Sequence, residues 1–192
     1  MKLTVNFASQ GRLLEGTLYL PDTTDEVMAG CLFEGAMTGA TVQVVDYLAR
    51  EVSHQGFVTL IMDHNYFGDD ETAPQPWESP FKRLQDILAA LHFLEDYGEV
   101  DKNRIFGVGV SVGGEFLAEA SRRTDILKGL IFVESPTDDT RNRIARLDIP
   151  SIVVDEAHLE TAVDEIVLWA RTLFSSHREE HGPDINWNLT DK

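Results

Sequence analysis

The stretch from Arg104 to Leu117, which reads Arg-Ile-Phe-Gly-Val-Gly-Val-Ser-Val-Gly-Gly-Glu-Phe-Leu, decides the fold. An apolar run typical of a buried strand leads into Gly-x-Ser-x-Gly, and a helix-forming segment follows. This order predicts a nucleophile elbow, a tight turn that lifts Ser111 clear of the sheet edge. Gly109 and Gly113 stand where a side chain would collide with a neighbouring strand or helix. The start of the next helix points free N–H groups toward the serine oxygen. A purely structural glycine-rich turn is the alternative interpretation.

The composition is that of an ordinary soluble globular protein. The 192 residues suffice for one domain with a substantial core, and 43% of them are hydrophobic and 26% charged. A formal net charge of −17 disfavours binding to nucleic acid or to an anionic membrane. The single cysteine, Cys31, excludes an intramolecular disulfide. The chain start lacks the apolar core of a signal peptide, and no apolar run approaches the ~20 residues of a membrane span. We therefore expect a cytoplasmic protein with no nucleic-acid or membrane partner.

The hydrophobic pattern predicts an antiparallel opening followed by alternating strands and helices. The expected strands are residues 3–7, 13–20, 28–33, 58–62, 104–111, 127–133 and 149–154. The expected helices lie around residues 45–52, 81–94, 112–122 and 162–174. We therefore expect one α/β domain over residues 1–192, with a polar tail from residue 175. Its sheet is mostly parallel, with an antiparallel N-terminal hairpin and helices on both faces.

Ligands of such sheets bind beyond the carboxyl ends of the parallel strands. Five polar residues each lie just past a predicted strand on that edge: Glu34, Asp63, Ser111, Glu134 and Asp155. We expect the functional site there. The acidic run at residues 69–71 has no histidine at ligand spacing, so we expect neither a metal site nor a cofactor.

These motifs resemble those of the alpha/beta-hydrolase superfamily, and within it the dienelactone-hydrolase-like group. The resemblance extends over about residues 13–152, and the order and spacing of five segments agree with the family: residues 11–21, 33–39, 56–64, 67–70 and the elbow. It implies an alpha/beta-hydrolase fold. It also implies hydrolysis of an ester, thioester, lactone or amide by a serine or cysteine nucleophile, a histidine base and an acidic residue. Ser111 takes the nucleophile position.

The resemblance also implies two donors for the oxyanion. The backbone N–H of Val112 is one of them, and the second comes from Ala36 or Met37 in the turn after the third strand. Where many relatives have His-Gly at the start of this turn, this chain has Glu-Gly. Dienelactone hydrolases carry a glutamate near this point. Glu34 therefore either acts on the nucleophile or its substrate, or is a solvated carboxylate at the end of a strand. A buried glutamate there is costly unless it is hydrogen-bonded.

The acid and the histidine of a triad fall in the last third of the chain. Relatives place the acid a few residues after the strand that corresponds to residues 149–154. Asp155 is the first candidate acid and Asp138 the second, while one alignment places His158 at the acid position. His181 lies nearest to the family's histidine, and His158 is the alternative base. A tail histidine without a function is a further interpretation.

The last strand of the family is not evident in this sequence. The predicted sheet therefore ends at residues 149–154. Unpaired backbone groups on an edge strand attract another strand. The tail or a second subunit is expected to cover this edge, and we expect a homodimer formed there.

Three functions fit these residues. The first is a serine hydrolase acting on a small-molecule ester, thioester or lactone: Ser111 attacks the acyl carbon, His181 or His158 takes its proton, and Asp155 orients that histidine. The second is a catalytically degenerate protein that keeps the fold and binds a small molecule or a partner. The third is a biosynthetic cyclase, lyase or acyl transferase that uses the same pocket.

Overall fold

The structure, a computed structural model, describes residues 1–22, 27–35, 40–63 and 79–179. Within these ranges seven strands form one sheet in the order β1-β2-β4-β3-β5-β6-β7. The strands are β1 (Lys2–Ser9), β2 (Arg12–Tyr19), β3 (Met28–Glu34), β4 (Val58–Met62), β5 (Val100–Val110), β6 (Leu127–Val133) and β7 (Ser151–Val154). The helices are α1 (Ala40–His54), α2 (Pro80–Asp96), α3 (Gly113–Ser121), α4 (Asp138–Ile144) and α5 (Leu159–Glu179).

The sheet has the predicted mixed topology. β1 and β2 form an antiparallel hairpin around Gln10 and Gly11, whose φ angles of 49° and 78° suit a two-residue turn that follows the twist of the strands. β2 is also antiparallel to β4, whereas the five strands from β3 to β7 are parallel to one another. The expected fold class, a mostly parallel sheet with an antiparallel N-terminal hairpin, is confirmed.

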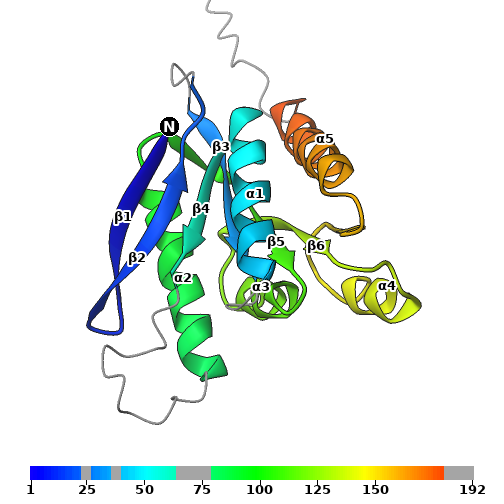
Figure 1. Cartoon of the computed structure of the whole chain (residues 1–192), viewed down its shortest axis with the longest axis horizontal. Coiled ribbons are helices and arrows are strands. Elements are labelled where there is room, and N and C mark those ends of the chain that lie inside the picture. The colour runs from blue at the N-terminus through cyan, green and yellow to red at the C-terminus, as the bar shows by residue number, and fades with distance from the viewer. Residues whose placement is uncertain (23–26, 36–39, 64–78, 180–192) are drawn as a thin grey trace, which may run out of the picture.

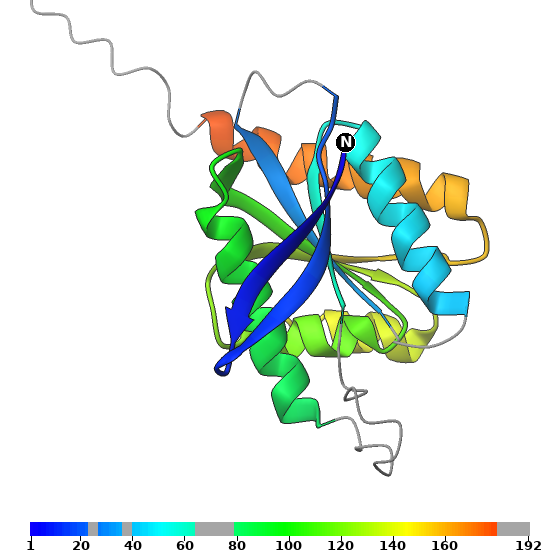
Figure 2. The same ribbon diagram turned by 60° about the vertical axis from the view of Figure 1, so that its left-hand side comes forward.

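Helices cover the sheet on both faces (Figure 1). α1 and α5 pack on one face and contact each other, while α2 and α3 do so on the other. Figure 2 shows the twisted sheet between these two layers. Each layer encloses its own apolar core. All seven residues of β3 are buried, because this central strand is covered from both sides.

Some elements differ from the sequence prediction. β5 begins at Val100, four residues early, and ends at Val110, which places Ser111 in the turn. α4 was not predicted, because Thr140 is its one buried residue and it therefore lacks an apolar stripe. α5 continues to Glu179, so the first residues assigned to a polar tail are helical. The rest of the tail lies outside the described residues.

In the described part of the chain, no helix has the length and apolar character that a bilayer span requires.

We predict that the docking of α5 depends on its buried face. Ile166 is fully buried, whereas Leu168 on the same helix is 69% exposed. Ile166→Ala should lower the free energy of unfolding by about 2–5 kcal/mol, because it leaves a cavity between α5 and the sheet. Leu168→Ala is the matched control and should change it by less than about 0.5 kcal/mol. Urea denaturation followed by circular dichroism measures both, and equal effects would contradict this packing.

Candidate active site at the strand–turn–helix corner

Ser111 occupies the corner between β5 and α3. Its φ of 54° lies in the left-handed region that non-glycine residues rarely adopt, and its side chain is exposed. Two hydrogen bonds fix this backbone: the Ser111 N–H donates to the carbonyl of Val133 at 3.1 Å, and the Ser111 carbonyl accepts from Gly114 N–H at 3.1 Å. The strand–turn–helix geometry predicted from the sequence is therefore present, and it presents the hydroxyl at the carboxyl edge of the sheet.

Three glycines allow this corner to form. A Cβ at Gly109 would lie 2.3 Å from the Cα of Gly114, and a Cβ at Gly114 would lie 2.4 Å from the ring of Phe132. A Cβ at Gly113 would lie 2.2 Å from the carbonyl oxygen of Glu34. None of these distances is tolerable for a carbon atom. The helix therefore rests directly on the backbone of β5 and on the end of β3.

The first residue after the serine offers an unoccupied hydrogen-bond donor. Val112 caps α3, and no described group accepts its backbone N–H. Free N–H groups at a helix start carry partial positive charge, which suits an oxyanion. Ala36 and Met37, the expected second donors, lie outside the described residues. The chain just before them, at Gly35, is in contact with the first turn of α3.

Glu34 is not solvated, and that interpretation was wrong. Its side chain is 1% exposed, and its Oε1 accepts from Arg83 Nε at 2.7 Å and lies 2.6 Å from Arg83 Nη2. The Nη2 group also donates to the carbonyl of Gly35 at 2.5 Å. Arg83 compensates the cost of burying the carboxylate, as the sequence argument required. A direct action of Glu34 on Ser111 stays a prediction.

Arg83 was not identified from the sequence. It lies in the first turns of α2, which begins with the N-cap Ser79, and its guanidinium stacks 4.2 Å from the ring centroid of Phe116 in α3. The sequence feature that could have identified Arg83 is its helical spacing from Ile87 and other buried residues of α2, which places Arg83 on the apolar face of that helix. Arg83 therefore joins α2, α3 and the end of β3 beneath the candidate site.

The candidate acids lie on the same edge of the sheet but not beside Ser111. Asp155 is exposed after β7, and its Oδ1 accepts from Ala157 N–H at 3.0 Å. β7 is two strands from β5, about 10 Å at the usual strand spacing. Asp138 is exposed in the first turn of α4. In the described part of the chain, no side chain forms a hydrogen bond with the Ser111 hydroxyl.

The two candidate histidines are placed differently. His158 is exposed at the start of α5, on the same edge of the sheet as Ser111. α5 then runs for 21 residues, about 30 Å, toward the opposite edge. There Arg171 donates to the carbonyl of Gln55, just before β4. His181 lies outside the described residues.

An ionic cluster next to the serine was also missed in the sequence. Val133, whose carbonyl binds the Ser111 N–H, is followed by Glu134. The guanidinium of Arg143 in α4 pairs with Glu134 through Nη2 and lies 2.5 Å from an oxygen of Glu115 in α3 through Nη1. These two ion pairs hold α4 against the end of β6 and the first turn of α3. The cluster had only a weak signal in the sequence, because α4 itself shows no apolar periodicity.

Comparison with known structures identifies the architecture. Est1E from Butyrivibrio proteoclasticus matches with a TM-score of 0.69 at 15% identity, over 90% of this chain and 99% of Est1E. A Klebsiella pneumoniae protein assigned as a dienelactone hydrolase matches with a TM-score of 0.66 at 14% identity, over 91% and 98%. This chain has the alpha/beta-hydrolase fold. The expected resemblance to dienelactone-hydrolase-like proteins is confirmed at the level of that fold.

The chain also resembles curated proteins in sequence. The quorum-quenching protein AidA of Acinetobacter baumannii is 24% identical over 165 residues, which are 86% of this chain and 54% of AidA. The chain spans about half the length, or less, of the curated relatives it matches. No protein-family profile matches the chain.

We predict that the elbow of this hydrolase fold does not tolerate a methyl group at Gly113. Gly113→Ala should lower the free energy of unfolding by about 1–3 kcal/mol, because the new Cβ collides with the backbone of Glu34. Gly98→Ala is the matched control, since a Cβ there has nothing within 4 Å. Its effect should stay within about 0.5 kcal/mol. Chemical denaturation of both variants gives the comparison, and a Gly113→Ala protein as stable as Gly98→Ala would refute the close contact.

Proposed function

We propose that the protein is a serine hydrolase that cleaves an ester, thioester or lactone of a small molecule at Ser111. One observation carries this proposal. Ser111 stands exposed at a left-handed corner of an alpha/beta-hydrolase fold, directly before a helix whose first N–H group has no described acceptor. A nucleophile and an oxyanion donor in adjacent residues are the minimum that acyl transfer requires.

The reaction proceeds in two halves. The Ser111 hydroxyl oxygen attacks the acyl carbon while a histidine takes its proton, and the carbonyl oxygen becomes an oxyanion held by the Val112 N–H and an N–H of Ala36 or Met37. Collapse of this intermediate expels the alcohol, thiol or ring oxygen, which receives the proton from the histidine. Water then attacks the acyl-enzyme by the same route and releases the acid.

His158 and His181 remain the two candidates for the base. The position of His158 supports it, because it lies on the Ser111 edge and follows Asp155, the proposed orienting acid, by three residues. To act as the base, His158 has to lie within the ~3 Å of the serine oxygen that proton transfer requires, directly or through one water. His181 is retained because of its position in the family order. Est1E has been solved with ferulic acid bound, which supports aryl esters as test substrates.

A second candidate function is binding without catalysis. One observation favours it: among the described residues no histidine forms a hydrogen bond with Ser111, whereas an ion-paired cluster of Glu134, Arg143 and Glu115 follows the end of β6. A protein of this kind would keep the pocket and lose the turnover. The biosynthetic alternatives have no observation of their own.

We predict that Ser111→Ala lowers kcat/KM for a p-nitrophenyl ester by at least about 10³-fold, because the nucleophile is lost. Ser121→Ala is the matched control, since Ser121 lies at the far end of α3 and bonds only to the carbonyl of Ala118. We also expect one of the two variants His158→Ala and His181→Ala to lose kcat/KM to a comparable extent, and that variant identifies the base. His92→Ala, an exposed histidine of α2, should not. Unchanged turnover in Ser111→Ala would end the hydrolase proposal, and a wild type without turnover would favour the binding function.

We also propose a homodimer formed along β7. Within the described ranges β7 pairs with β6 alone, and Ser151, Ile152 and Val153 are only half-buried. An edge of this kind offers unpaired N–H and C=O groups to a second copy.

We predict a particle of twice the 21.5 kDa chain mass in light scattering at micromolar concentration. The β7 amides should exchange hydrogen more slowly as the concentration rises, because dimerisation pairs them. The other sheet edge, β1, is the internal control and should show no such dependence. A particle of 21.5 kDa would count against the dimer.

A further inference from the structure

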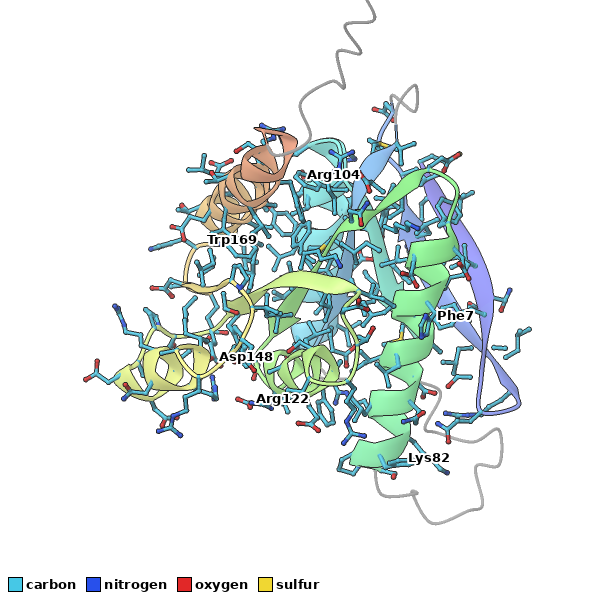
Figure 3. All side chains as sticks on the ribbon, turned by 180° about the vertical axis from the view of Figure 1, so that it is seen from behind. Phe7, Lys82, Arg104, Arg122, Asp148 and Trp169 are labelled. Atoms are coloured by element: carbon cyan, nitrogen blue, oxygen red, sulfur yellow. The ribbon has the colours of Figure 1, made fainter. Side chains whose placement is uncertain are left out.

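A cavity of about 320 Å³ lies at the edge of the sheet opposite to Ser111. It is formed by the start of β3, the turn between α1 and β4, the middle of β5 and the last turns of α5. Figure 3 shows Arg104, one of its lining residues, at this end of the sheet near α5. Its volume is at the lower end of the range for small-molecule sites, about 300–1,000 Å³.

The inner wall of this cavity is apolar. Phe57, Ala170 and Phe174 line it, and each of them is buried in the core beneath α1 and α5. Met28 and Ala29 continue this surface at the start of β3. Such a wall excludes water from a hydrocarbon or aromatic ligand and stabilises it through apolar burial.

Two arginines stand on the rim of the cavity. Arg104 donates from Nε to Asp101 at 2.8 Å and from Nη2 to the carbonyl of Val27 at 2.6 Å. Arg171 donates from Nη2 to the carbonyl of Gln55 at 2.9 Å, and no carboxylate of the described residues pairs with it. A guanidinium has five N–H donors, so both side chains keep donors for a ligand.

The charge balance at this rim selects a singly charged anion. Asp101 offsets the charge of Arg104, whereas Arg171 has no carboxylate partner among the described residues. The chain carries a net charge of −17, with 33 acidic against 16 basic side chains. Among the described residues Arg141 and Arg146 also lack an acidic partner, but of these three arginines Arg171 alone lines the cavity. Its backbone anchor also holds the guanidinium in place before a ligand arrives.

We propose that this cavity binds a small amphipathic monocarboxylate. Its carboxylate pairs with Arg171 and with the free donors of Arg104, in the fork geometry that guanidinium groups offer. Its apolar body packs against Phe57 and Phe174. The site lies at the far end of the parallel strands from Ser111, so it does not depend on catalysis there.

Isothermal titration calorimetry with sodium octanoate tests this proposal. We expect saturable binding of one octanoate per chain, and at least tenfold weaker binding of the uncharged octanamide. Arg171→Gln should weaken octanoate binding about tenfold, since it removes the uncompensated charge from an exposed position where folding is not at risk. Arg122→Gln is the matched control, because Arg122 is an exposed arginine at the C-cap of α3, outside the cavity.

Ser111→Ala separates this cavity from the candidate active site and should leave octanoate binding unchanged. Three results would overturn the proposal: no saturable binding of octanoate, equal affinity for octanamide, or equal affinity in wild type and Arg171→Gln. Binding that is lost in Ser111→Ala would also overturn it, because the ligand would then occupy the elbow.

Discussion

The backbone contact between β5 and α3 sets the position of the Ser111 hydroxyl and of the Val112 N–H at the carboxyl edge. Gly109 and Gly114 touch without room for a side chain, so α3 can begin only directly at the end of the strand. Ser111 must then take up a left-handed φ, which costs of order 1–3 kcal/mol. The packing of α3 on Phe132 and its neighbours offsets that cost. The same contact leaves the Val112 N–H beside the hydroxyl.

A second constraint holds the end of β3 and Gly35 in place. Gly113 packs against the backbone of Glu34, and the carboxylate of Glu34 forms an ion pair with Arg83. Both partners are 1% exposed, so removing either one leaves a buried charge, which typically costs 3–5 kcal/mol. Because Arg83 also touches α3 through Phe116, one guanidinium joins the elbow to the turn where the second oxyanion donor is expected.

Most of the fold could be predicted from the sequence, because its elements carry regular apolar patterns. β3, β4 and β6 are mainly apolar runs, and α2 and α5 repeat apolar residues at helical spacing. α4 could not be predicted, since its stability comes from an N-cap at Thr137 and from ion pairs of Arg143. These pairs join segments that are distant in the chain.

The candidate site was predicted only in part, for the same reason. Gly-x-Ser-x-Gly is a local signal, so the corner at Ser111 was found from sequence alone. The partner of Glu34 was not, because a contact across 49 residues leaves no local pattern. The acid and the base depend on distances between strand ends and the start of α5, which no spacing in the sequence determines.

The most direct test is the reactivity of one hydroxyl group. A fluorophosphonate probe forms a covalent adduct only with a serine that a neighbouring base activates. After incubation with the folded protein and digestion with trypsin, mass spectrometry should find a single adduct on the peptide of residues 105–122, at Ser111. An unmodified peptide from folded protein, under conditions that fully label a known serine hydrolase, would contradict the assignment of Ser111 as a nucleophile.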